Sequence, residues 1–200
     1  MEPRIIGEMK PLRHFILLAG CLPMLATLAP AVAQDRMVLG VELGTRFLVS
    51  ACNPGETAFP SRLCFNGALK TRKAWGADEY YVFVPNAGTP PYVRGEIRVS
   101  VINGIVESVQ IGTWGIQAQG IALEALTKKY GVPTRARQEK QNTLRSRFPT
   151  QFAEWELKDF SVKLDGTTGS IDWGRIDFST HRYRKLIGDY EKQPPAKPPK

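Results

Sequence analysis

The pair Asn103-Gly104 stands between two apolar stretches, and no other local pattern leaves the backbone so few choices. Asparagine and glycine tolerate the two positive φ angles of a type I′ turn, which joins antiparallel strands. We therefore predict a two-residue hairpin formed by residues 97–102 and 105–111. One face of this hairpin would be apolar and belong to the core, through Ile97, Val99, Val101 and Val106.

One amphipathic helix is predicted after the hairpin, over residues 115–130. Lys128 and Lys129 suit its negative C-terminal end, Gly131 suits the position just past it, and Pro133 prevents continuation. Residues on one face recur at steps of three and four, the period of a single buried stripe. They are Ile116, Gly120, Leu123, Leu126 and Tyr130.

Three strands are predicted after this helix, at residues 153–157, 160–164 and 171–178. Each alternates apolar and polar residues, and a one-residue change of phase in the last predicts a bulge at Gly174. Earlier segments are assigned to a strand at 37–43, a short helix at 45–52, a long loop at 56–77 and a strand at 80–85. The predicted fold class is α+β: an antiparallel β-sheet, made of the hairpin plus a three-strand meander, packed against one main helix.

The first thirty-three residues have the layout of a secretory signal peptide. Lys10 and Arg13 precede an uncharged apolar run at 15–30, and Ala31-Val32-Ala33 supplies small residues for cleavage. The run is shorter than the ~20 residues that span a bilayer. We expect cleavage after Ala33, with Met9 as an alternative start, and a periplasmic or secreted protein.

A second interpretation of the leader stays open. Leu18-Ala19-Gly20-Cys21 matches a bacterial lipobox, in which Cys21 would be lipidated. Only residues 15–18 precede it as strongly apolar residues, and the apolar character continues past Cys21, which favours cleavage after Ala33. We expect a single domain at 34–188 and a disordered, Pro- and Lys-rich tail at 189–200.

Removal of the leader leaves two cysteines, Cys52 and Cys64, with eleven residues between them. An oxidising compartment favours their pairing, and closing such a loop stabilises the fold by ~3 kcal/mol. A reactive thiol or a zinc site would need further His or Cys partners, and His181 is the one histidine of the mature chain. We predict a disulfide, and neither a metal nor a cofactor.

Positive charge is concentrated between residues 128 and 147. The chain carries a net charge of +8, or +7 without the leader, and this segment opposes seven basic residues to Glu139 alone. Such a patch attracts anions over a Debye length of roughly 8 Å, although a solvated loop has the same composition. The candidate binding residues are Lys128, Lys129, Arg135, Arg137, Lys140, Arg145 and Arg147.

Asp177, Ser179 and His181 invite comparison with a catalytic triad. Neighbours two apart on a strand project side by side and cannot form its relay of hydrogen bonds, so we expect an exposed histidine. The oxygen-rich segment 165–172 lacks the ligand spacing of a calcium loop, and we expect a turn.

Glu154 and Glu156 alternate with apolar residues, which assigns them to the wet face of a strand rather than to an acid–base pair. Trp75 and Trp114 lie in glycine-flanked loops, where an exposed indole can bind a partner. Packing is the commoner fate of tryptophan, so both readings stay open.

Gly40-Val41-Glu42-Leu43-Gly44-Thr45 and the phrase Leu-Thr-Lys-Lys-Tyr-Gly-Val-Pro-Thr at 126–134 resemble small exported bacterial α+β modules. Outer-membrane assembly lipoproteins and β-lactamase-inhibitor-like domains belong to this group, in which a strand ends in Leu-Gly and a helix ends in Gly-x-Pro. The resemblance implies a binding or scaffolding role in a bacterial envelope. It carries no site residue over.

We therefore expect a non-catalytic module for an anionic envelope partner, with peripheral membrane contact as one form of it. The alternatives are a secreted inhibitor or effector that docks through its aromatic loops, and a cell-wall hydrolase that uses carboxylates alone. Nucleic acid is excluded by the compartment and by the lack of aromatic residues interleaved with the charges.

Overall fold

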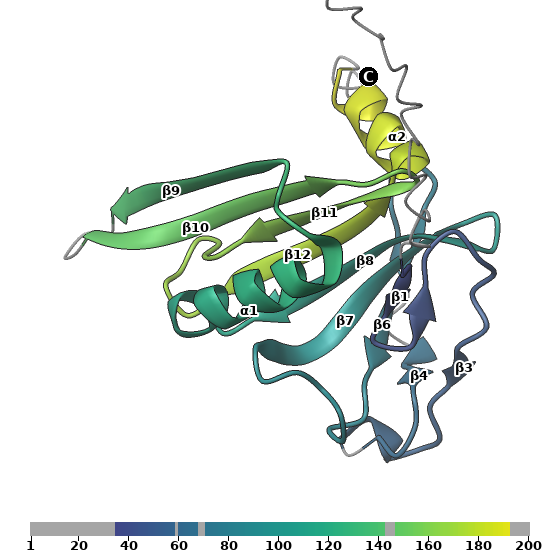
Figure 1. The fold of residues 1–200 in the computed structure, drawn as a ribbon. Coiled ribbons are helices and arrows are strands. Elements are labelled where there is room, and N and C mark those ends of the chain that lie inside the picture. The colour runs from purple at the N-terminus through teal and green to yellow at the C-terminus, as the bar shows by residue number, and fades with distance from the viewer. Residues whose placement is uncertain (1–34, 59, 68–70, 143–146, 193–200) are drawn as a thin grey trace, which may run out of the picture. The chain divides into compact units, whose positions relative to one another are not determined.

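A computed structural model describes residues 35–58, 60–67, 71–142 and 147–192, all within one compact unit at 34–200 (Figure 1). Its fold is α+β, with a large sheet, two helices and a disulfide in the described residues. The long helix α1 (Gly115–Tyr130) lies across one face of the sheet, and α2 (His181–Glu191) follows the last strand. A short 3-10 helix, η1, occupies Glu56–Ala58.

The large sheet has the order β3-β4-β6-β7-β8-β12-β11-β10-β9, and β5 pairs with β6 off this path. All pairs are antiparallel except β3 with β4. The hairpin β7–β8 therefore lies beside the last strand of the chain, β12. The bounds are β3 (Ser50–Ala51), β4 (Cys64–Phe65), β5 (Thr71–Arg72), β6 (Asp78–Phe83), β7 (Val93–Ile102), β8 (Ile105–Thr113), β9 (Arg135–Asn142), β10 (Arg147–Glu156), β11 (Phe160–Asp165) and β12 (Gly174–Thr180).

The hydrophobic core lies between the sheet and α1. Ala118, Ala122 and Leu126 of the helix are buried against it, together with large residues such as Trp155 and Phe160. A small hairpin of β1 (Met37–Val38) and β2 (Val41–Glu42) adds Val38, Val41 and Leu43 to the same core. One face of the sheet is thus dry, and we call the opposite face the open face.

The predicted central hairpin is confirmed. Asn103 and Gly104 have φ angles of 52° and 78°, as a type I′ turn requires. The four residues assigned to its core face, Ile97, Val99, Val101 and Val106, are all buried. The register shifts once, because Ser100 pairs with Ser108 while Val101 pairs with Val106, which makes Glu107 the extra residue of a β-bulge.

The predicted helix at 115–130 is confirmed with the bounds of α1, but its predicted buried stripe is partly wrong, because Gly120 is exposed and Ala118, Ala122 and Leu126 are buried. Its N-terminus depends on Gly115, whose φ is +52° and whose position would bring an added Cβ within 2.1 Å of the Ile171 carbonyl oxygen. Lys129, near the other end, bonds the Met37 carbonyl oxygen and pairs with Asp35, which ties the β1–β2 hairpin to the helix.

Other predictions at the N-terminal end are wrong. The short helix expected at 45–52 is irregular chain that ends in β3, with Phe47 N–H bonded to the Gly104 carbonyl oxygen. The loop expected at 56–77 contains η1, β4 and β5. Very short strands that depend on tertiary pairing leave little local signal.

At the C-terminal end the expected three-strand meander has four strands, β9 to β12, and the expected single main helix has a companion, α2. The bulge expected at Gly174 is absent, since that residue begins β12 and residues 171–173 form the preceding turn. Helix α2 ends at Glu191 and so includes the first three residues of the segment expected to be a disordered tail. Residues 193–200 and the leader lie outside the described part of the chain.

The predicted disulfide is present between Cys52 and Cys64, whose Cα atoms are 4.8 Å apart. It joins the residue after β3 to the first residue of β4, so it closes one edge of the sheet. Within the described residues, no helix is long and apolar enough to cross a membrane.

Candidate ligand-binding groove

Cross-strand pairing arranges the open face into rows of polar side chains. Because directly paired residues of neighbouring antiparallel strands point to the same face, the register alone defines these rows. The charged row crosses six strands through Arg135, Glu154, Lys163, Asp177, Gln110 and Arg98. The serine row runs parallel to it through Glu156, Ser161, Ser179, Ser108, Ser100 and Glu79.

The serine row forms a hollow floor. Its four serines retain only 6% to 9% of their surface, although they lie on the polar side of the sheet. The Ser108 and Ser179 hydroxyls are 3.3 Å apart, and Tyr183 of α2 donates to the Ser100 hydroxyl at 2.9 Å. A sheet face that meets only water favours longer or β-branched side chains, so four small ones in adjacent strands create a depression.

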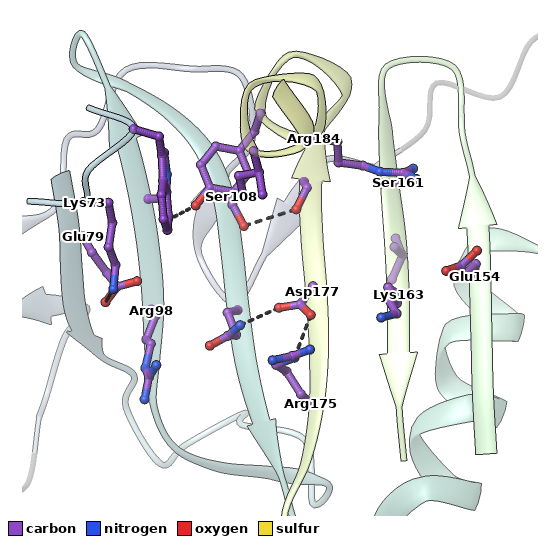
Figure 2. Close-up of a pocket in the computed structure, with 18 of the residues that line it drawn as sticks. Lys73, Glu79, Arg98, Ser108, Glu154, Ser161, Lys163, Arg175, Asp177 and Arg184 are labelled. Carbon is purple, nitrogen blue, oxygen red and sulfur yellow. Dashed lines mark hydrogen bonds and ion pairs between the residues drawn. The ribbon is translucent and has the colours of Figure 1, made fainter. Parts of the chain in front are cut away.

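The charged row alternates in sign across its first four strands, from Arg135 to Asp177. The Gln110 side chain donates to the Asp177 carboxylate at 2.7 Å, and Arg175 Nε lies 2.8 Å from the same group (Figure 2). Arg175 also bonds Asp165 at 2.9 Å. These contacts hold the centre of the row rigid.

Arg98 ends the charged row and differs from its other members. Its guanidinium lies 5.4 Å from the Tyr81 ring centroid, and its side chain is exposed. Among the described residues no carboxylate forms an ion pair with it. Arg98 is therefore a cation whose charge is open to an incoming group.

Burial raises the pKa of the Asp177 carboxyl group, and the nearby Asp165 acts in the same direction. The Arg175 charge, the Gln110 bond and the Lys163 charge oppose this rise. Burial lowers the pKa of Arg175, but its two carboxylate partners outweigh that effect and raise it. The carboxylate and the guanidinium thus act as a structural pair under the groove.

A groove of about 700 Å³ lies over both rows (Figure 2). Side chains of α2 and Trp75 line one end of it, and Figure 2 shows the helix above the serine row. Five basic and five acidic residues line this part, so its formal charge is balanced. The volume is within the range of small-molecule sites, roughly 300–1,000 Å³.

The groove continues beyond Arg98 into a second hollow of about 300 Å³, which shares Arg98, Gln110 and Arg175 with the first. Arg94 and Glu96 supply its other charges, so this end has a formal excess of one positive charge once Arg175 is paired with Asp165 and Asp177. Trp173 forms part of its wall and is 46% exposed.

The predicted basic patch is divided by the fold. The segment expected to be a loop is largely strand, because β9 covers Arg135–Asn142. Lys128 and Lys129 belong to α1, on the opposite face, and Lys129 is engaged by Asp35. Arg135 lies 3.7 Å from Glu154, and Arg137 pairs with Glu139 and lies over Phe152. Arg145 and the side chains of Lys140 and Arg147 lie outside the description.

Arg135 and Arg137 nevertheless lie on the open face, where they border a smaller hollow of about 210 Å³ with Phe152, Glu154 and Lys163. This hollow adjoins the groove through Glu154 and Lys163, which line both. Two of the predicted binding residues are thus close to the groove, and two are on the far side of the sheet.

The two tryptophans predicted as candidates for partner binding occupy different environments. Trp75 is half-buried, packs against Tyr190 with ring centroids 5.6 Å apart, and lines the α2 end of the groove. Trp114 is 46% exposed and bonds the Val93 carbonyl oxygen through its indole N–H at 3.1 Å. Sequence reasoning missed Trp173, because it was assigned to the interior of the last strand.

The residues considered for catalysis are each engaged elsewhere. His181 begins α2, with its Nδ1 3.2 Å from Glu156 and its Nε2 3.0 Å from the Leu157 carbonyl oxygen. Ser179 and Asp177 contact Ser108 and Gln110 instead. In the segment 165–172, the Asp165 carboxylate is held by Arg175 and Lys163, and the described residues contain no cluster suited to a metal ion.

Comparison with known proteins returned no match: no protein-family model, curated protein or solved structure is significantly similar to this chain.

Proposed function

We propose that this chain is an exported, non-catalytic binding module that holds an anionic component of the cell envelope in the groove on its open face. The observation that carries the proposal is the conjunction of a recessed serine floor with the exposed Arg98 beside it, which pairs with no carboxylate in the described part of the chain. Such a floor admits a ligand, and an exposed guanidinium can bind a carboxylate or phosphate through two parallel hydrogen bonds.

Rigidity also supports binding rather than turnover. Two of the groove carboxylates, Glu79 and Glu156, form ion pairs with Lys73 and Arg184. A general acid or base must exchange a proton with its substrate, and a carboxylate held by a cation is poorly suited to do so. The disulfide agrees with an oxidising compartment.

The test compares two charge reversals of equal size. Arg98→Glu alters the groove, and Lys128→Glu makes the same change on α1, outside it. Envelope components retained by the immobilised wild-type protein at physiological salt are measured for each variant. We expect Arg98→Glu to reduce retention at least tenfold, and Lys128→Glu to leave it within twofold.

Equal losses from both variants would mean that net charge alone drives retention, which contradicts a site in the groove. Release of soluble products from a cell-wall substrate by the wild-type protein would contradict the non-catalytic part of the proposal. Both positions are exposed, so we expect both variants to fold. Thermal unfolding of each variant checks this.

A further inference from the structure

We infer that the ligand of the groove is an acidic polysaccharide, a chain of sugars that carry carboxylates, with one sugar ring stacked on Trp173. This inference rests on the proposed function and names its ligand class. It joins three features of the open face: a row of hydroxyl groups, an exposed guanidinium and an exposed indole, in that order along the groove.

Hydroxyl-rich ligands need partners that both donate and accept hydrogen bonds. A serine hydroxyl has one donor and two acceptor positions, and the Gln110 amide offers both kinds of group. The bonds among Ser108, Ser179, Ser100 and Tyr183 use only part of this capacity. The balanced formal charge of this part of the groove suits a ligand whose contacts are mainly neutral hydroxyls.

A sugar ring also has an apolar C–H face, whose slightly positive hydrogens are attracted to the negative face of an aromatic ring. Trp173 offers such a ring where the groove passes into its positively charged end. Trp114 is equally exposed, at 46%, but it lines neither hollow.

The Trp173 indole is held in place before a ligand arrives. The Arg94 guanidinium covers one face of its ring, 3.6 Å from the centroid, and lies 4.4 Å from the centroid of Trp114, so the sugar would stack on the other face of Trp173. Arg94 also donates to the Asp172 carbonyl oxygen at 3.0 Å, and Thr168 N–H donates to the Trp173 carbonyl oxygen. A side chain already ordered loses little entropy on binding, which favours affinity.

Arg98 lines both hollows, so it lies between the hydroxyl-rich floor and the Trp173 wall. We expect a carboxylate on the sugar next to the stacked one to bind this guanidinium. Because Asp165 and Asp177 hold Arg175, the remaining charges at this end are Arg94, Arg98 and Glu96, and their excess of one positive charge favours an acidic chain over a neutral one.

The experiment measures the affinity of the mature protein for three polymers: polygalacturonate, an acidic sugar chain; dextran, a neutral sugar chain; and poly-L-glutamate, an acidic chain without sugars. We expect polygalacturonate to bind at least tenfold more tightly than either of the others. Trp173→Ala should weaken polygalacturonate binding about tenfold and leave poly-L-glutamate unchanged.

Two further variants test whether the effect depends on the aromatic ring at position 173. Trp114→Ala removes the other indole in contact with Arg94, which lines neither hollow, and should weaken polygalacturonate binding less than Trp173→Ala does. Trp173→Phe keeps an aromatic face and should restore most of the affinity lost in Trp173→Ala. The same three variants are compared by thermal unfolding, so that a loss of fold is recognised.

Equal affinity for polygalacturonate and poly-L-glutamate would overturn the polysaccharide assignment and leave the anion-binding proposal standing. If the folded Trp173→Ala variant binds polygalacturonate as tightly as the wild type, the stacking role of Trp173 is overturned and the anion-binding proposal again remains. Failure of both polyanions to bind the wild-type protein would overturn the polysaccharide assignment, whereas the proposed function, which also admits a phosphate-bearing ligand, is contradicted only if Arg98→Glu and Lys128→Glu reduce retention equally.

Discussion

Asp177 lies under the groove, and its raised pKa determines whether the free energy of unfolding rises or falls with pH. Between the ordinary value of 3.8 and the raised value, the folded chain binds more protons than the unfolded chain. The free energy of unfolding therefore falls as pH rises through this window. In Asp177→Asn this contribution is absent, so the wild type should lose stability relative to the variant with rising pH, by at most ~1.4 kcal/mol per pH unit. Urea unfolding between pH 3.5 and 7 measures the difference.

Asp35 provides a comparison of opposite sign. The bond from Lys129, with that from the Met37 N–H, lowers the pKa of this carboxyl group. Its stabilising contribution is present above the ordinary value and is lost as pH falls, so the wild type should gain stability relative to Asp35→Asn as pH rises. Parallel stability profiles for the wild type and Asp177→Asn would contradict the sign assigned to Asp177.

At the residue scale, the sequence predicted one face of each strand well and the other poorly. Alternation identified Ile97, Val99 and Trp155 as core residues. Their polar neighbours were assigned to the opposite face only because they alternate with these core residues. That Ser108 lies beside Ser179 depends on β8 pairing with β12, between which the chain makes α1 and three strands. Sequence periodicity contains no information on such a pairing, so the serine row could not be predicted.

At the element scale, α1 depends on a glycine at its first residue. Gly115→Ala would force a Cβ against the Ile171 carbonyl oxygen at an unfavourable φ, and we expect a loss of about 3 kcal/mol or more. Gly120→Ala, on the same helix, meets nothing within 4 Å and should stabilise the protein by roughly 0.5–1 kcal/mol. Chemical denaturation of the pair measures both, and equal effects would contradict the role of Gly115.

Helix α2 is held to the sheet by the bulge residue Glu107. Its buried carboxylate accepts from the Thr180 hydroxyl and lies 3.2 Å from Arg182 at the start of the helix. Glu107→Gln should cost about 1.5–3 kcal/mol, because a buried bond to a charged group is lost. Hydrogen exchange of the α2 amides should accelerate with it.

Tyr183→Phe is the milder comparison for α2. It removes one neutral hydrogen bond to Ser100 and keeps the packed ring, so we expect a loss of about 1 kcal/mol. Unchanged amide exchange in Glu107→Gln would show that α2 is held mainly by the packing of Tyr183 and its neighbours.

The elements that the sequence missed share a physical cause. The Arg135–Asn142 strand has no apolar alternation, because as an edge strand it takes its hydrogen bonds from β10, and its residues 135–139 are all exposed. Helix α2 did carry a signal: Thr180 caps it by accepting from the Tyr183 N–H, and Tyr183, Leu186, Ile187 and Tyr190 follow at helical spacing. The adjacent Pro- and Lys-rich tail obscured that pattern.

At the scale of the whole molecule, the sheet separates two kinds of surface. Its dry face holds α1 and the β1–β2 hairpin and supplies the burial that stabilises the fold. Its open face carries small and charged side chains that contribute less to stability and define the groove. The class α+β and the disulfide could be predicted from sequence, because each follows from local patterns; the strand order could not.

The disulfide lies at the edge of this sheet formed by β3 and β4. Its loss should lower the stability of the fold and leave the affinity of the groove for its ligand unchanged. Opening the loop between Cys52 and Cys64 should lower the free energy of unfolding by ~3 kcal/mol, because the unfolded chain gains freedom. Urea unfolding with and without reductant measures this loss, and a Cys52→Ser/Cys64→Ser double variant should be insensitive to reductant. No residue that lines the groove belongs to β3 or β4. Affinity for polygalacturonate should therefore stay within twofold, whereas a parallel loss of affinity would mean that the groove depends on this edge of the sheet.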